Sequence, residues 1–285
     1  MERIDAMLNR KPERTLFHYT DAQGLLGILK SKRIWASSVY HLNDSSEFRY
    51  PFDLISDLLQ SNLKHENAPH NKKYGILLDD MPTVTQHVQA YVASFTEDGD
   101  LLSQWLTYPR APNGYAIGLS PNQFVAATNG GFLLVPCIYD EAQQIELANA
   151  MIVALLELVG EPETVTDHET LDSVSSRVLT VAAALKHPGF AREAEWRLIK
   201  TIPVGFGKSK EVLFRQGRNG IVPYLQAPLV AEDTEQFAPS AIHIGPNEDM
   251  HAAQIAINTL LDRNGLYKLF GQQVKIEVSK TPYRQ

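Results

Sequence analysis

Cysteine is almost absent from this chain, which contains a single one, Cys137, among 285 residues. One thiol can form neither an internal disulfide bond nor a zinc site built from several thiolates. Cys137 lies in the apolar run 131–140, so we expect it to be a buried free thiol on a strand. Disulfide-stabilised scaffolds and thiolate zinc proteins are therefore excluded.

Long apolar runs and an excess of positive charge are lacking as well. The longest apolar stretch, 148–160, is much shorter than the roughly 20 residues of a membrane-spanning helix. The first 14 residues carry too many charges for a signal peptide. The net charge of -7 argues against a broad nucleic-acid-binding face. We therefore expect a soluble cytoplasmic protein that does not contact a membrane.

Several motifs of common enzymes are missing. The chain has no Walker phosphate-binding loop, no G-x-G-x-x-G after a strand and no H-E-x-x-H. Its nine histidines show no spacing typical of metal ligands. These absences exclude P-loop enzymes, dinucleotide-binding dehydrogenases and the common zinc hydrolases, and we expect no bound metal.

The composition nevertheless supports a folded protein, with 44% hydrophobic and 21% charged residues. Period-two and apolar segments predict strands at 17–20, 33–37, 89–97, 115–120, 132–140, 195–202, 211–216, 221–230, 240–245 and 274–279. Helical patterns and caps predict helices at 22–32, 48–60, 101–108, 121–128, 141–159, 168–186 and 247–265. The polar stretch 61–75 is expected to be a loop.

This order of elements predicts an α+β fold, with mixed or antiparallel sheets of short strands and flanking helices. No position is a convincing domain boundary, so we expect one domain over 1–285, with 140–190 as a helical insertion.

Polar side chains gather where the predicted strands and helices begin or end. Such groups cost free energy when buried unless they are paired or bind something. An imidazole, several hydroxyls, aromatic faces and carboxylates together would suit a nucleotide sugar. The residues in question are His18, Tyr19, Thr20, Asn43, Asp44, Glu47, Ser94, Thr96, Trp105, Tyr108, Glu193, Glu195 and Arg197.

Each of these groups also has a purely structural interpretation. His18 could be a core histidine bonded to a backbone carbonyl. Asp44 and Glu47 have the spacing of a helix-capping box. Trp105 could belong to the core, and Arg197 could simply pair with a neighbouring glutamate.

The spaced words of the sequence resemble a large family of uncharacterised bacterial proteins. The words are HYT, GLxxIL, WAS, LNDxxE, SFTE, SQWxxY, ExEWR and PYR, and they extend over nearly the whole chain. This resemblance alone implies no activity.

More distantly, the layout resembles the ADP-ribosyltransferase superfamily. The resemblance implies that His18 holds the ribose of NAD and that Tyr19 and Thr20 lie beside it. Ser94 and Thr96 would form the second motif, although the sequence there departs from a full S-T-S. Trp105 and Tyr108 would supply ring faces, and Tyr91 or Tyr108 would be the platform for nicotinamide. Glu195 would be the catalytic carboxylate, with Glu193 two residues before it.

Two functions follow as hypotheses. The first is an enzyme of the kind that serves as a toxin or defence effector. It would use NAD as a substrate and transfer ADP-ribose to a protein, nucleic acid or small acceptor, or to water. The second is a non-catalytic module that senses a nucleotide or binds a protein in a bacterial stress or phage-defence system. Glu195 separates the two, because an enzyme needs this carboxylate free in a cleft that also contains His18. A structural role would tie Glu195 to Arg192 or Arg197. The oligomeric state stays open.

Overall fold

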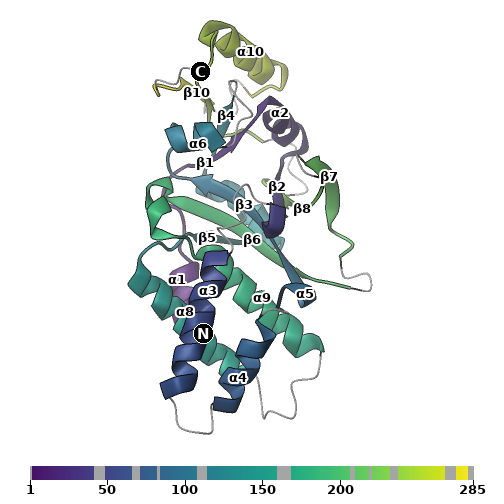
Figure 1. The fold of residues 1–285 in the computed structure, drawn as a ribbon. Coiled ribbons are helices and arrows are strands. Elements are labelled where there is room, and N and C mark those ends of the chain that lie inside the picture. Colours follow the sequence, from purple (N-terminus) through teal and green to yellow (C-terminus); the bar gives the residue numbers. More distant parts are fainter. Residues whose placement is uncertain are drawn as a thin grey trace.

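The computed structural model describes residues 2–41, 49–65, 71–81, 84–107, 114–158, 168–205, 209–217, 220–231, 237–266 and 274–281. It shows the expected α+β fold, with an elongated open sheet and helices on both of its faces (Figure 1). The strands are β1 (Leu16–Thr20), β2 (Arg33–Ser38), β3 (Val88–Thr96), β4 (Tyr115–Leu119), β5 (Leu133–Pro136), β6 (Glu195–Pro203), β7 (Leu213–Gly217), β8 (Gly220–Pro228), β9 (Ala241–Ile244) and β10 (Lys275–Val278). The helices longer than one turn are α1 (Glu2–Leu8), α2 (Ala22–Ser31), α3 (Arg49–His65), α4 (Asn71–Asp80), α6 (Leu102–Thr107), α7 (Val125–Asn129), α8 (Glu141–Leu158), α9 (His168–Ala184) and α10 (Met250–Arg263).

The strands join in the order β10-β9-β4-β1-β3-β2-β8-β7, and β6 pairs with both β3 and β5. The pair β9–β10 is parallel and the other ladders are antiparallel, so the sheet is mixed as expected. The longest ladder joins β3 to β6 over nine residue pairs, from Val88↔Pro203 to Thr96↔Glu195. This ladder forms the centre of the molecule.

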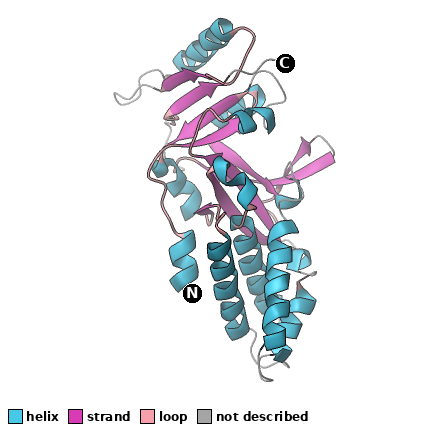
Figure 2. Ribbon diagram, turned by 60° about the vertical axis from the view of Figure 1, so that its left-hand side comes forward, coloured by secondary structure: helices cyan, strands magenta, loops and turns pink. Residues whose placement is uncertain are grey.

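Each face of the central ladder is covered by its own core, because successive side chains of a strand point to opposite faces. On one face, Val92 and Ile199 pack with apolar residues of α1, α3, α4, α8 and α9. On the other, Trp196 and Leu198 pack with residues of α2, α7 and α10. The alternation predicted for 196–202 is therefore confirmed. The first group of helices forms a bundle at one end of the molecule (Figures 1 and 2).

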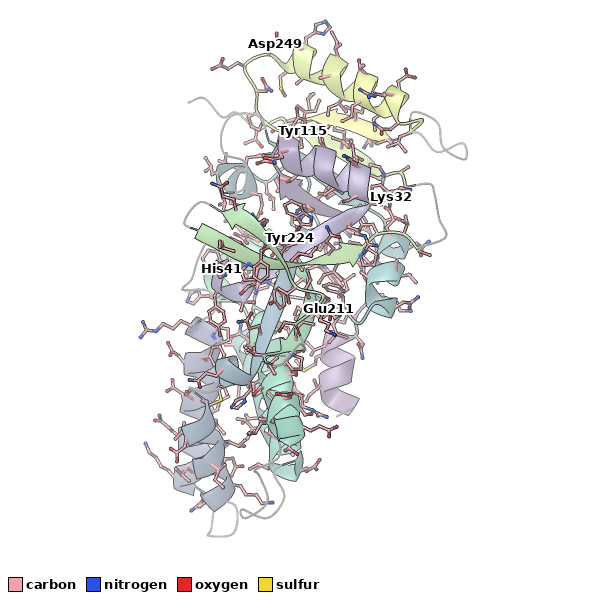
Figure 3. All side chains as sticks on the ribbon, turned by 90° about the vertical axis from the view of Figure 1, so that its right-hand side faces the viewer. Lys32, His41, Tyr115, Glu211, Tyr224 and Asp249 are labelled. Carbon is pink, nitrogen blue, oxygen red and sulfur yellow. The ribbon has the colours of Figure 1, made fainter. Side chains whose placement is uncertain are left out.

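Two helix ends follow their sequence signals. Asp21 caps α2, since its carboxylate accepts a hydrogen bond from the Gly24 amide at 2.7 Å. Asp249 caps α10 in the same way, through the Ala252 amide at 2.9 Å, and stands at the start of that helix (Figure 3). None of the helices in the described ranges is both long and apolar enough to cross a bilayer.

The prediction of a loop over 61–75 was wrong at both of its ends, whereas its middle part, 66–70, lies outside the described residues. Helix α3 continues to His65, and α4 begins at Asn71. Tyr74, Leu77 and Leu78 have the three- and four-residue spacing of one helix face, and they pack into the core beneath the bundle. Because polar residues precede Tyr74 in the sequence, this apolar spacing was not recognised as the start of a helix.

The strand predicted over 132–140 is also shorter than expected, because β5 ends at Pro136, which cannot donate a hydrogen bond to the ladder. Cys137 is buried as predicted, and as the chain's single cysteine it forms no internal disulfide bond, but it lies one residue beyond the strand. The short helices α1 and α5 (Val84–His87) were not predicted. Helices α8 and α9, within the predicted insertion 140–190, pack in the bundle, and α9 also contacts β3 and β6.

Candidate functional site

A small pocket opens where β1, β3 and β6 come together. It is lined by Phe17, Tyr19, Ser94, Phe95, Thr96, Gln104 and Glu195. The space within its rim, including the open mouth, is about 250 Å³, with room for about one ordered water molecule. Thr96 pairs with Phe17 of β1 and with Glu195 of β6, so it joins the two sides of the pocket. A pocket of this size can admit one polar group of a ligand but not a whole nucleotide.

Tyr19 and α6 form one wall of the pocket. The Tyr19 hydroxyl donates to the Asp98 carbonyl at 2.9 Å and accepts from the Leu101 amide at 2.8 Å. Its ring meets the Trp105 ring edge-on, with centroids 4.5 Å apart, and Trp105 Nε1 donates to Asp100 at 2.8 Å. Burial raises the pKa of Tyr19, so the phenol stays protonated. Tyr19 and Trp105 are therefore building elements of the wall, and their polar atoms are already used.

Other polar groups that line the pocket have unused hydrogen-bonding capacity. Among the described residues, the Ser94 hydroxyl and the Gln104 side-chain amide have no hydrogen-bond partner. The Thr96 hydroxyl accepts one bond, from the Asp98 amide at 3.3 Å, and donates none to the described chain. Gln104 is nevertheless buried. The unpaired polar atoms of Ser94 and Gln104 are not among the fully buried ones, so they are accessible from the pocket and, with the Thr96 hydroxyl, are suited to bonding a ligand or water.

Four ionic side chains, Lys186, Glu193, Glu195 and Arg197, continue the site beyond the pocket; we call them the ion cluster. Arg197 bonds both carboxylate oxygens of Glu195, at 2.7 Å from Nε and 3.2 Å from Nη2. Lys186 Nζ contacts the Glu195 carboxylate and also lies 2.6 Å from Glu193. Lys186, Glu195 and Arg197 are only 3%, 5% and 2% exposed. Glu195 is thus tied to Arg197, as the structural alternative predicted, and to Lys186 as well.

The balance of burial and charge fixes the state of Glu195. Burial alone would raise the pKa of its carboxyl group, but the charges of Arg197 and Lys186 outweigh that effect and hold the pKa at about 2. Glu195 is therefore an anion at neutral pH, and it is one that lines a pocket.

The backbone before Glu195 brings the two carboxylates together in an unexpected way. We predicted that Glu193 and Glu195 would face the same way because the chain would be extended. Instead, Glu193 ends a short 3-10 helix, Pro188–Glu193, and Ala194 adopts the left-handed conformation with φ 40° and ψ 50°. The sharp turn still lets both carboxylates reach Lys186 Nζ. Strain of this kind in a non-glycine residue costs about 1–2 kcal/mol, and it often accompanies functional sites.

We expect Ala194→Gly to raise the free energy of unfolding by up to about 1 kcal/mol, because glycine adopts positive φ without steric cost. Urea denaturation of the two proteins measures the difference. Ala191→Gly, in the same short helix but with no positive φ, is the matched control and should be neutral or destabilising. If Ala194→Gly lost as much stability as Ala191→Gly, the positive φ of Ala194 would not be a source of strain.

The structure does not bring His18 to this site. Phe17 and Tyr19 line the pocket, so His18, between them on β1, points to the opposite face of the sheet. There its ring lies 5.5 Å from that of Phe95, and Nδ1 is 2.9 Å from the Ser94 carbonyl. Burial lowers the pKa of His18, so the imidazole is neutral at pH 7. The expected cleft shared by His18 and Glu195 is therefore not formed, whereas Tyr19, Ser94, Thr96, Trp105 and Glu195 do come together.

Thr20 follows Tyr19 on β1 and, like His18, is not part of the pocket lining. Tyr91 packs in the core on the α2 side of the sheet, with its hydroxyl on Gln89, so it offers no platform at the pocket. Tyr108 and the Asn43, Asp44 and Glu47 group lie outside the described residues.

Three residues of the site were missed from the sequence. Lys186 was treated as the end of a helix, Gln104 as part of the SQW word, and Tyr139 as part of a strand. Tyr139 accepts a hydrogen bond from the Glu195 amide at 3.0 Å. The only available signal was a lysine at the end of an otherwise apolar helix segment, 181–186.

The comparisons with known proteins give one match. The model of a family described as "Protein of unknown function (DUF2971)" matches residues 104–198. No curated protein and no solved structure matches this chain. The matched segment holds Gln104, Tyr139 and all four members of the ion cluster, whereas His18, Tyr19, Ser94 and Thr96 precede it. The chain thus resembles an uncharacterised family over the part that carries the ion cluster.

Proposed function

We propose that this protein is a binding module for a small polar ligand of the nucleotide class, and that a hydroxyl or amide group of the ligand enters the pocket beside Glu195. The observation that carries this proposal is the unused hydrogen-bonding capacity of Ser94, Thr96 and Gln104 around an ionised carboxylate. A sugar hydroxyl can donate to Glu195 and accept from the Gln104 amide at the same time.

The state of Glu195 favours binding over catalysis. Its two oxygens already accept three charge-assisted hydrogen bonds, from Arg197 and Lys186. These bonds fix the carboxylate in place and weaken it as a base or nucleophile. A fixed anion is well suited to recognising a hydrogen-bond donor of a ligand.

A thermal-shift screen of the wild-type protein with NAD, ADP-ribose, ATP and AMP tests the proposal. A ligand at one hundred times its dissociation constant stabilises the folded protein by about 2.7 kcal/mol, which is a readily measured shift. No stabilisation by any of the four compounds would overturn the proposal.

For a ligand found in this way, we expect Gln104→Leu to weaken binding by about 5- to 30-fold, since a lost hydrogen bond that leaves a ligand group unpaired costs about 1–2 kcal/mol. Isothermal titration calorimetry provides the affinity. Gln23→Leu, at an exposed position of α2, is the matched control and should bind normally. Equal affinities of the two variants would show that Gln104 does not contact the ligand.

A second candidate, transfer of ADP-ribose from NAD, is favoured by one observation: the pocket is lined by a carboxylate that is anionic at neutral pH. Such an anion can stabilise a positively charged ribose carbon as nicotinamide leaves. This candidate has to operate without His18, which lies across the sheet.

If the protein is such an enzyme, we expect the wild type to release nicotinamide from NAD and Glu195→Gln to release it at least 100-fold more slowly. Glu193→Gln should spare hydrolysis and lose transfer to an acceptor. Circular dichroism of both variants shows whether they are folded. The absence of release by the wild type, with protein, nucleic-acid and water acceptors, would exclude this candidate whatever the variants do.

A further inference from the structure

Three aromatic side chains stand together beyond the ion cluster, outside the pocket. The rings of Tyr50 and His187 meet edge-on with centroids 5.1 Å apart, and those of His187 and Phe190 with centroids 6.3 Å apart. Tyr50 is the second residue of α3, while His187 and Phe190 belong to the turn that leads into Glu193. His187 and Phe190 are exposed, and Phe190 retains 37% of its accessible surface.

This aromatic group is continuous with the candidate site through Lys186. The ammonium nitrogen of Lys186 lies 5.1 Å from the centroid of the Phe190 ring and also contacts Glu195, which lines the pocket. The Lys186 carbonyl accepts a 2.7 Å hydrogen bond from Gln144, whose other amide atom accepts a 2.6 Å bond from Tyr50. One network therefore holds the pocket, the ion cluster and the aromatic group.

The exposed rings offer two different kinds of contact. Phe190 presents part of a ring to solvent, which can stack on a flat partner. His187 Nδ1 accepts a hydrogen bond from the Gly189 amide at 3.1 Å, so in the neutral imidazole the proton is on Nε2. A stacking ring beside an N–H donor matches a flat heteroaromatic ring with acceptor nitrogens.

We propose that Phe190 and His187 form the platform for a nucleobase. The base stacks on Phe190 and accepts a hydrogen bond from His187 Nε2, while the sugar of the same ligand extends over the ion cluster toward the Gln104 pocket. This assignment rests on the proposed function and adds to it the part of the ligand that the pocket is too small to hold.

The competing explanation is that Phe190 only shields Lys186 from water. The experiment therefore compares AMP with ribose 5-phosphate, which differ by the base alone, by calorimetry on four proteins. These are the wild type, Phe190→Leu, Phe190→Trp and the control Phe214→Leu. Leucine keeps an apolar cover over Lys186 without a ring. Phe214 is an exposed phenylalanine on β7, with 67% of its surface accessible.

We expect the wild type to bind AMP more tightly than ribose 5-phosphate. Phe190→Leu should weaken AMP binding at least about fivefold and leave ribose 5-phosphate unchanged. Phe190→Trp should keep AMP binding, with quenching of the new indole, and Phe214→Leu should behave as the wild type.

Equal affinity of the wild type for the two compounds would overturn the platform while leaving the proposed function standing. The same would follow if Phe190→Leu left AMP binding intact, or weakened both compounds equally. If the wild type bound neither compound, nor any compound of the thermal-shift screen, the proposed function itself would fail.

Discussion

Replacing Arg197 with methionine is expected to lower the free energy of unfolding by about 3–5 kcal/mol, which is a large part of the stability of a typical domain. The guanidinium makes two hydrogen bonds to Glu195 and a third, at 2.9 Å, to the Ala183 carbonyl of α9. Methionine fills much of the same space, but it removes one of the two positive charges that balance the buried Glu195 carboxylate. Urea denaturation followed by circular dichroism measures the effect.

Arg192→Met is the matched control, because Arg192 is exposed in the turn just before the ion cluster. Its change should lie within about 0.5 kcal/mol of zero. Combining Arg197→Met with Glu195→Gln removes the uncompensated charge, so the double variant should be more stable than Arg197→Met alone. An Arg197→Met protein as stable as the control would mean that the ion cluster does not support the fold.

The second large effect is a loss of stability in acid. The pKa of Glu195 is held at about 2 in the folded protein, against its usual value of 4.5. A depressed folded pKa contributes stability that is fully present above pH 4.5 and is lost as the pH falls toward 2. The difference of about 2.5 pH units corresponds to roughly 3 kcal/mol.

Other carboxylates also contribute to the loss of stability in acid. For Asp100, burial alone would raise the pKa, but its hydrogen bonds outweigh that effect and lower it. The test is therefore the difference in unfolding free energy between the wild type and Glu195→Gln, measured at several values between pH 7 and pH 2.5. We expect this difference to be constant down to about pH 4.5. Below that pH it should decrease by most of the roughly 3 kcal/mol that the depressed pKa contributes. A difference independent of pH would place the Glu195 pKa near its usual value.

The order and type of most elements could be predicted from the sequence because their signals are local. Capping by Asp21 and Asp249 and the alternation along Trp196–Ile202 each depend on residues a few positions apart. The extension of α3 to His65 and the start of α4 at Asn71 could not be predicted, because these two polar segments become helical through the packing of Leu63 and Tyr74 on the bundle.

The part of the candidate site that could be predicted is the part formed by the pairing of β3 with β6. Ser94, Thr96 and Glu195 were expected together, and the β3–β6 register unites them. His18 was expected with them as a polar residue at a strand end that matches the first motif of the resemblance, but neighbours on a strand face opposite ways, and Tyr19 faces the pocket instead. Lys186, two residues beyond the end of α9, meets Glu195 through a tertiary contact, which the lysine at the end of an apolar segment does not by itself indicate.

The β3–β6 ladder has a consequence for how variants of this protein would appear in a living cell. The same nine residue pairs carry the edge of the pocket at Thr96 and Glu195 and the two cores that hold the molecule together. A substitution at the pocket edge therefore also changes the unfolded fraction that proteases remove, and a loss of 1–2 kcal/mol is enough to alter steady-state abundance several-fold. When a substitution of Thr96 or Glu195 causes a defect in cells, the abundance of the variant therefore has to be measured before the defect is attributed to lost binding.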